Sequence, residues 1–418
     1  MGSYFLGIDF GTSGVRAVVI DSQGQIQQQS RCDYAIDNTK SWQIALSQIL
    51  ESIEIDLKEQ LCSILIDGTS STVILCDQSG NPLDEPILYN DARAVGQISF
   101  LDNILTEPHL VKNATSSLVK LLWWSDHSPI FAKAAYFLHQ ADWLSFLLHG
   151  QLGLSDYNNA LKLGYDQELM KYPDWLFSLP IAHLLPKVLT PGSYISKITP
   201  QVSSKYRISQ DCQVAAGTTD SIAAFIASGA NCLGDAVTSL GSTLVVKMLS
   251  QKNIHNNHYG IYSHRLGNYW LTGGASNSGG AVLKKFFSAE QLERLSGSIN
   301  PQQSSRLDYY PLLKVGERFP INDPNFAPRL EPRPEDDILF LQGILEGIAR
   351  IEHRGYELLN TLGAGSLTRV YSVGGGAQNE PWRQMRENIL AVPVLKCSQS
   401  EAAYGAAKLA MGGSTLKI

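Results

Sequence analysis

Asp9 stands where a carboxylate could do chemistry. It ends an apolar, strand-like run, and Gly11, Thr12 and Ser13 follow it almost at once. A carboxylate at the end of an apolar strand is costly unless it is paired or turned toward a ligand. The structural alternative is an Asx-turn, in which the side chain bonds to its own backbone. The hydroxyl-rich turn that follows favours the functional interpretation.

Asp220 is the second candidate. It follows "AAGTT" and precedes the apolar run "SIAAFIASGA", so we expect it at the start of a helix. A carboxylate within hydrogen-bond reach of a hydroxyl can accept its proton as a general base. Aspartate is also among the best helix N-caps, and from the residues alone the cap is the stronger interpretation.

Two glycine-hydroxyl turns, one in each half of the chain, could bind phosphate. "DFGTSGVRAVV" and "SLGSTLVVKML" share an apolar residue, a glycine, hydroxyl residues and an apolar strand. Neither matches GxxxxGK[ST] or GxGxxG. Backbone N–H groups and hydroxyls in such turns can hold phosphate oxygens without a lysine. One interpretation is a pair of ordinary hairpins. In the other, Gly241, Ser242 and Thr243 face the same polyphosphate as the first turn.

A third glycine-rich turn, "GGGAQN" at 374–379, follows the apolar strand "RVYSV". Consecutive glycines allow a backbone to approach a ligand closely. The alternative is a simple connection from a strand to a helix.

The elements that must position these residues form a mixed α/β pattern. Residues 4–10, 16–20 and 26–32 read as strands joined by tight turns, which predicts an antiparallel meander rather than a Rossmann unit. A helix is expected over 41–60. Strands are expected on either side of 68–71, and 118–148 is expected to be mostly helical.

The composition bounds the class of protein. A chain of 418 residues exceeds one core, so we expect two domains. The net charge of −6, with no basic cluster, disfavours a nucleic-acid or membrane partner. Six scattered cysteines indicate a reduced compartment without disulfides or a zinc site. No apolar stretch has the length of a membrane span, and a strand begins close to Met1, so we expect a cytoplasmic protein.

An ordered set of motifs along nearly the whole chain resembles the FGGY carbohydrate kinases, a branch of the actin/hexokinase/Hsp70-like ATPases. The motifs are "GIDFGTSGVRAVVID", "PLDEPILYNDARA", "ADWLSFLLHGQLGLSDYNNALKLGYD", "VAAGTTDSIAAFIASGA", "SVGGGAQNEPWRQMRENILAVPV" and "EAAYGAAKLA". The resemblance implies two RNase H-like (actin-like ATPase) α/β domains with a central cleft. We expect residues 1–212 to form the sugar side and 213–418 the ATP side.

The resemblance also assigns roles. Asp220 becomes the catalytic base, and Asp9 becomes a catalytic and sugar-facing residue near the water shell of Mg²⁺. The sugar is expected at the loop 68–71 and the segment 90–93, with Arg93 alternatively forming a structural ion pair with Asp91. The implied sugar ligands are Asp9, Ser71, Asp91, Arg93 and Asp220. The implied ATP ligands are Thr12, Ser13, Arg16, Gly241, Ser242, Thr243, Gly279, Gly375, Gly376 and Asn379.

The implied reaction is ATP-dependent phosphorylation of the terminal hydroxyl of a ketopentose. D-ribulose is preferred, because "GTSS" stands where xylulose kinases have a Gln-Met-His type loop. D-xylulose or another polyol is the alternative. From other classes, an actin- or Hsp70-like conformational module and a silent sugar sensor are both disfavoured. The expected state is a monomer or homodimer.

Overall fold

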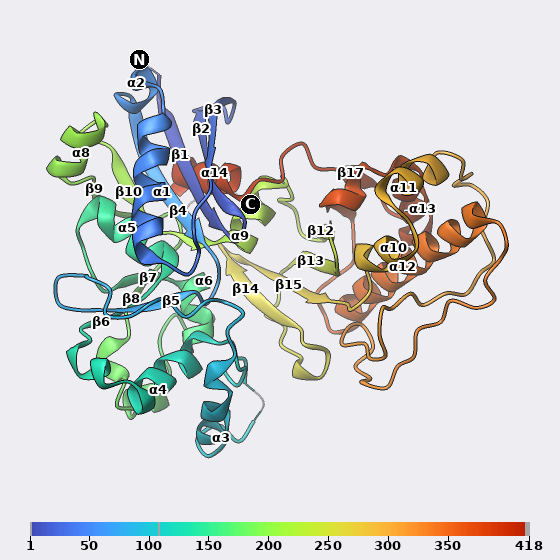
Figure 1. Cartoon of the computed structure of the whole chain (residues 1–418), viewed down its shortest axis with the longest axis horizontal. Coiled ribbons are helices and arrows are strands. Elements are labelled where there is room, and N and C mark those ends of the chain that lie inside the picture. The colour runs from blue at the N-terminus through green and yellow to red at the C-terminus, as the bar shows by residue number, and fades with distance from the viewer. Residues whose placement is uncertain (1, 108, 414–418) are drawn as a thin grey trace. The chain divides into compact units, whose positions relative to one another are not determined.

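The computed structural model describes residues 2–107 and 109–413. The chain divides into two compact units, which are described separately (Figure 1). The first contains residues 2–227 and 401–413, and the second contains residues 228–400.

The first unit is built on a seven-stranded mixed sheet with the order β3-β2-β1-β4-β10-β9, and β11 also pairs with β4. β1, β2 and β3 form the predicted antiparallel meander, whereas β1 and β4 run parallel. Two smaller pairs, β5–β6 and β7–β8, lie outside this sheet. The strands are β1 Tyr4–Gly11, β2 Gly14–Asp21, β3 Ile26–Cys32, β4 Leu61–Gly68, β5 Val73–Cys76, β6 Tyr136–His139, β7 Leu154–Asp156, β8 Lys187–Leu189, β9 Tyr194–Lys197, β10 Gln213–Ala215 and β11 Thr218–Thr219.

Helices cover this sheet and form a second core beside it. Residues of α1, α5, β1 and β4 share one buried apolar cluster, and residues of α4, β5 and β6 share another. The helices are α1 Thr39–Ser52, α2 Ile55–Lys58, α3 Gln97–Asp102, α4 Ser117–His127, α5 Gln140–His149, α6 Tyr157–Ala160, α7 Asp174–Phe177, α8 Pro200–Tyr206, α9 Asp220–Ala227 and α14 Ala402–Gly412.

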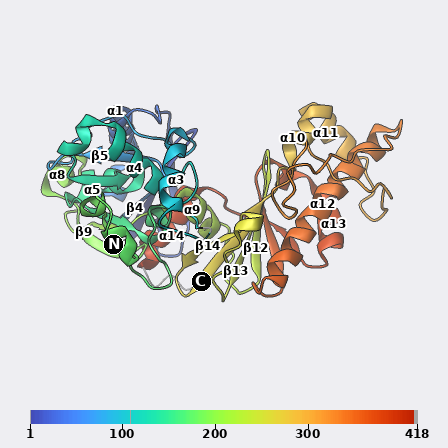
Figure 2. The same ribbon diagram turned by 90° about the horizontal axis from the view of Figure 1, so that it is seen from below.

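The last helix returns to the first unit. In Figures 1 and 2, α14 lies beside α9, although nearly the whole second unit separates them in sequence. Gly405 makes this crossing possible, because a Cβ there would lie 1.8 Å from the carbonyl oxygen of Ala223.

The second unit repeats the plan of the first sheet. Its six strands have the order β14-β15-β13-β12-β16-β17. The hairpin β12–β13 is antiparallel and β12 runs parallel to β16, as β1–β2 and β4 do in the first unit. The elements are β12 Asp235–Leu240, β13 Leu244–Ser250, β14 Tyr262–Leu266, β15 Tyr269–Ala275, β16 Arg369–Val373, β17 Val394–Lys396, α10 Gly280–Phe286, α11 Ala289–Ser296, α12 Asp337–Thr361 and α13 Glu380–Leu390.

Three sequence-based expectations differ from the structure. The helix expected over 41–60 is divided, because Ile53 is extended and turns its side chain into the core. The helix expected over 118–148 is interrupted by β6, which pairs with the distant strand β5. The boundary expected near 212 lies inside the first unit, because β10 and β11 both pair with β4.

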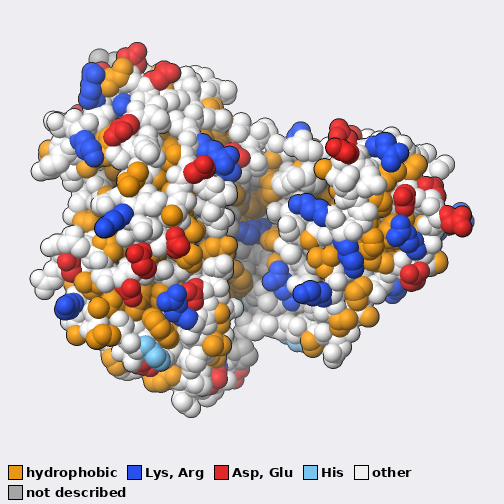
Figure 3. Space-filling view, viewed as in Figure 1, with side chains coloured by type: hydrophobic (Ala, Val, Ile, Leu, Met, Phe, Trp, Pro, Cys, Tyr) orange, Lys and Arg blue, Asp and Glu red, His pale blue; other side chains and the backbone are white. Residues whose placement is uncertain are grey.

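Acidic and basic side chains are interspersed over the molecular surface drawn in Figure 3. Neither unit shows a field of a single sign on that face. Among the described residues, no helix combines the length and apolar character needed to cross a membrane.

Candidate active site

Three aspartates gather at the carboxyl ends of adjacent parallel strands in the first unit. In the register of the sheet, Asp9 of β1 lies opposite Asp67 of β4. Thr218 of β11 lies opposite Asp67, and Thr219 lies opposite Gly68. Asp220 follows directly as the first residue of α9, as expected. The sheet therefore brings Asp9 and Asp220 to one edge, with Asp67 beside them.

Asp67 was not predicted as a site residue. It is fully buried, and Asp9 is only 4 % exposed. The two carboxyl groups share a hydrogen bond. With both groups ionised, both oxygens of Asp67 and Oδ1 of Asp9 have no hydrogen-bond partner in the described part of the chain. Two ionised carboxylates have no donor between them, so this contact requires a proton on one of the pair.

Burial determines which group holds the proton. Burial raises the pKa of Asp67 well above its usual range, and the charge of Asp9 raises it further. Burial also raises the pKa of Asp9, to about 6, while the hydrogen bond from Asp67 opposes this shift. The charge of Asp220 adds to the rise and that of Arg16 reduces it. These shifts favour a proton on Asp67, which then donates to Asp9.

The turn after Asp9 carries the predicted phosphate ligands of the first unit. Thr12 and Ser13 are exposed at the tip between β1 and β2. Arg16 is half-buried and forms an ion pair with Glu401, at 3.1 Å between Nη1 and Oε2. Arg16 is thus tied to the start of α14, and it also contributes positive charge near Asp9.

The predicted sugar residues lie on two connected segments. Ser71 is buried at the end of the loop after β4, and the hydroxyls of Ser70 and Ser71 have no hydrogen-bond partner among the described residues. Asp91 and Arg93 pair with each other, at 2.6 Å between Oδ2 and Nη2. The structural ion pair foreseen for these two residues is therefore present. It lowers the pKa of Asp91.

In the second unit, a cavity of about 740 Å³ collects five of the predicted ATP ligands. They come from the β12–β13 turn and from the glycine-rich turn after β16. They are Gly241, Ser242, Gly375, Gly376 and Asn379. Apolar side chains such as Leu240 and Leu283 share the lining with these backbone and hydroxyl groups. Such a mixture of apolar surface and a few polar groups is typical of sites for small ligands.

The two remaining predicted ATP ligands of the second unit do not line this cavity. Thr243 is exposed on the turn. Gly279 supports the turn from behind: its φ is +145°, and a Cβ there would lie 2.7 Å from the backbone of Thr243. The next residue, Gly280, donates its N–H to the carbonyl of Gly241 at 2.9 Å.

The cavity also has lining residues that sequence reasoning missed. Asn379 caps α13 through the N–H of Trp382 and donates from Nδ2 to Ser296 Oγ at 2.8 Å. Ser296, Glu293 and Lys284 come from α10 and α11. The signal that could have found them is the helical pattern after Gly279, but its residue types are ordinary for a surface helix.

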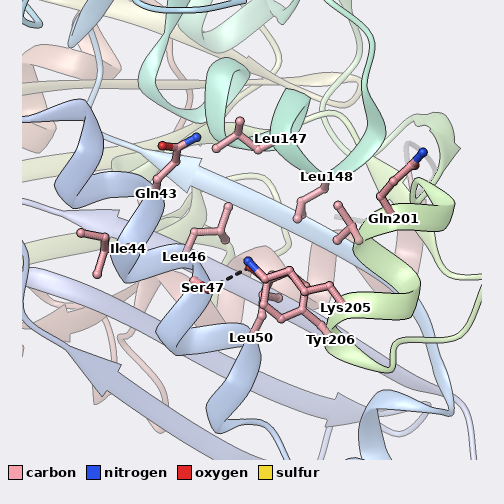
Figure 4. Close-up of a pocket in the computed structure, with 11 residues that line it drawn as sticks. Gln43, Ile44, Leu46, Ser47, Leu50, Leu147, Leu148, Gln201, Lys205 and Tyr206 are labelled. Atoms are coloured by element: carbon pink, nitrogen blue, oxygen red, sulfur yellow. Dashed lines mark hydrogen bonds between the residues drawn. The ribbon is translucent and has the colours of Figure 1, made fainter.

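A second hollow, of about 480 Å³, lies between α1, α5 and α8 (Figure 4). Aliphatic side chains form much of it, and Ser47 Oγ lies 2.9 Å from the hydroxyl of Tyr206. None of the predicted site residues lines it.

Comparisons with known proteins give family matches along nearly the whole chain. Residues 4–227 match the N-terminal domain of the FGGY family of carbohydrate kinases, and residues 229–413 match its C-terminal domain. The xylulose kinase of Bacillus subtilis is 27% identical, covering 98% of this chain and 88% of that protein. A gluconokinase of Bacillus licheniformis is 22% identical, covering 94% and 84%.

Solved structures confirm the predicted fold. That of xylulose kinase from Rhodospirillum rubrum has a TM-score of 0.85 at 18% identity, covering 99% of this chain and 92% of that one. That of gluconate kinase from Lactobacillus acidophilus has a TM-score of 0.82 at 18% identity, covering 99% and 89%. The two family matches together span nearly the whole chain, and the protein therefore belongs to the FGGY family of ATP-dependent carbohydrate kinases.

Proposed function

We propose that the protein transfers the γ-phosphoryl group of ATP to the terminal hydroxyl of D-ribulose. The observation that carries the choice of a polyol is the loop after β4. The hydroxyls of Ser70 and Ser71 are buried and lack partners in the described residues. Buried hydroxyls that the protein leaves unpaired are groups that a bound polyol can satisfy. The small side chains of this loop favour D-ribulose.

The proposed chemistry uses the aspartates in distinct roles. The oxygen of the sugar hydroxyl forms a bond to the γ-phosphorus, the bond to the leaving ADP oxygen breaks, and the hydroxyl proton passes to the carboxylate of Asp220. Asp9, ionised beside a protonated Asp67, binds the sugar. The glycine-lined cavity of the second unit holds the adenosine of ATP, and Ser242 meets the phosphates.

Mg²⁺ is the proposed metal, and it neutralises the charge of the phosphates. Among the described residues, no group of three or more His, Cys, Asp or Glu side chains could hold a metal ion. Mg²⁺ usually keeps several waters and takes one or two carboxylates besides substrate phosphates. Asp9, whose Oδ1 has no hydrogen-bond partner among the described residues, fits that smaller role through a water molecule.

D-xylulose is the second candidate, because the B. subtilis relative is named a xylulose kinase. A coupled assay of ADP release decides between them. The panel comprises D-ribulose, D-xylulose, gluconate, glycerol and the pentitols, each with MgATP and with ATP plus a chelator. We expect the highest kcat/KM for D-ribulose and no turnover without Mg²⁺. A higher kcat/KM for D-xylulose would replace the first choice, and turnover of none of these compounds would overturn the proposed function.

A further inference from the structure

We propose that Lys120 is a positioning residue that holds both sugar-facing segments in register through its buried ammonium group. Lys120 lies on α4 and is fully buried. Its Nζ donates to the carbonyl of Ser71 at 2.7 Å and to the carbonyl of Leu88 at 2.6 Å. The inference rests on the proposed sugar site, because it concerns how that site is held.

The first contact fixes a turn in an unfavourable conformation. Residues 69–72 form a turn closed by the N–H of Thr72 and the carbonyl of Thr69, at 3.2 Å. Ser71 is its third residue and has a φ of +65°. A left-handed third position normally takes glycine, so a serine there needs surroundings that hold it in place. The ammonium on its carbonyl is such a restraint, and Ser71 is the residue whose unpaired hydroxyl is assigned to the sugar.

The second contact fixes the neighbouring segment. The carbonyl of Leu88 also accepts the N–H of Asp91 at 3.0 Å, closing the turn that precedes Arg93. Trp123 lies one helical turn beyond Lys120, and the guanidinium of Arg93 lies over its ring. The distance from Arg93 Cζ to the centroid of the ring is 5.4 Å. The same helix therefore holds both ends of this segment.

The two segments are also joined directly. The N–H of Tyr89 donates to Thr72 Oγ1 at 3.1 Å, and Val73 pairs with Ile87. Lys120 therefore contacts two turns that are bonded to each other, rather than two independent loops. Because its side chain is fully buried, it acts on the sugar only through the carbonyls that it holds.

The cost of this arrangement argues for a role beyond packing. The carbonyls that accept from the ammonium are uncharged, and burial lowers the pKa of Lys120 to about 7. The positive charges of Lys162 and Arg93 lower the pKa of Lys120 further, and the charge of Asp91 opposes them. An apolar side chain would fill the same space without desolvating a charge.

The test compares Lys120→Met with Lys58→Met, after the substrate panel has identified the best sugar for the unaltered protein. Lys58 is also largely buried and donates to one carbonyl, that of Leu50 at 3.4 Å, in the α1–α2 region. For each protein, the KM for sugar, the KM for ATP and kcat are measured, with thermal melts as a check of folding.

We expect Lys120→Met to raise the KM for sugar by about 10- to 100-fold, the worth of a hydrogen bond to a charged group. The KM for ATP should be unchanged, and Lys58→Met should alter neither constant. An unchanged KM for sugar, or an equal rise in both constants, would overturn the inference while leaving the kinase assignment intact. If the Met variant does not fold, Lys120→Gln is held to the same criteria, because its amide is uncharged and its side chain is one atom too short to bond both carbonyls as Lys120 does.

Discussion

At the residue scale, the three aspartates are distinguished by what surrounds them. Asp220 begins a helix at a half-buried position, Asp9 is nearly buried and Asp67 is completely buried. The deepest carboxyl group therefore holds its proton most strongly, which leaves Asp9 as the anion of the Asp9–Asp67 pair.

The proposed role of Asp220 as general base predicts the effect of Asp220→Asn. The amide preserves the size of the side chain but cannot take the proton of the sugar hydroxyl. We expect kcat to fall roughly 10²–10⁴-fold while ATP binding is retained. Single-turnover assays and a nucleotide titration measure the two quantities. A nearly normal kcat would mean that Asp220 serves only the start of α9.

The Asp9–Asp67 pair predicts a pH effect. Activity should fall as the pH drops through about 6, because Asp9 then takes up a proton. Asp67→Val removes the hydrogen bond that lowers the pKa of Asp9, so the acidic limb of kcat/KM should move to higher pH. Asp67→Asn keeps a donor and should leave the limb in place. Identical limbs in both variants would show that Asp67 does not set the charge of Asp9.

At the element scale, one buried ion pair joins the helices and sheet of the second unit. Arg386 of α13 donates two hydrogen bonds of 2.7 Å to the carboxylate of Glu352 of α12. It donates a third, also of 2.7 Å, to the hydroxyl of Ser372 of β16. Both charged residues are at most 1 % exposed. α13 begins at the cavity assigned to ATP, so this pair anchors the wall of that site.

Glu352→Gln leaves the Arg386 charge buried without its counterion. We expect the free energy of unfolding of the second unit to fall by about 3–5 kcal/mol. Urea titration followed by hydrogen exchange in β16 reports this unit rather than the first. Arg333→Gln is the control: its pair with Asp337 is about half exposed, so its loss should cost less than about 1 kcal/mol. Equal losses in the two variants would contradict the anchoring role.

At the scale of the whole molecule, the proposed reaction uses residues of both units. The carboxylate cluster belongs to the first unit and the glycine-lined cavity to the second. Each unit also contributes a glycine-hydroxyl hairpin, on the same strand plan. If both hairpins contact one polyphosphate, their hydroxyls must act together.

Thr12→Ala and Ser242→Ala test this joint action. Each should weaken transition-state binding by roughly 1.5–3 kcal/mol, the worth of a hydrogen bond to a charged group. In a double-mutant cycle on kcat/KM for ATP, the two effects should be coupled. Sugar affinity without nucleotide should stay constant and serves as the control. Strictly additive losses would indicate separate ligands, and normal ATP kinetics in both variants would leave the hairpins a purely architectural role.

The sequence alone determined the local features of this protein. The alternation of apolar residues placed the first three strands, and turn residues indicated the antiparallel meander, because both signals lie within a few neighbouring residues. It also placed Asp220 at the start of a helix and identified the glycine turns that line the cavity. The ordered motifs indicated the family.

Only the tertiary structure decided which distant residues meet. The pairing of Asp67 with Asp9 depends on the register of β1 against β4, and two strands and two helices separate these strands in the chain. The contacts of Lys120 join three segments. α14 packs on α9, although the second unit separates these two helices in the sequence. In the amino-acid sequence, an Asp or Lys within a short apolar run gives no sign of whether the folded protein provides it with a partner. Its partner is set by the long-range pairing of strands and packing of helices, which leave no local periodic signal.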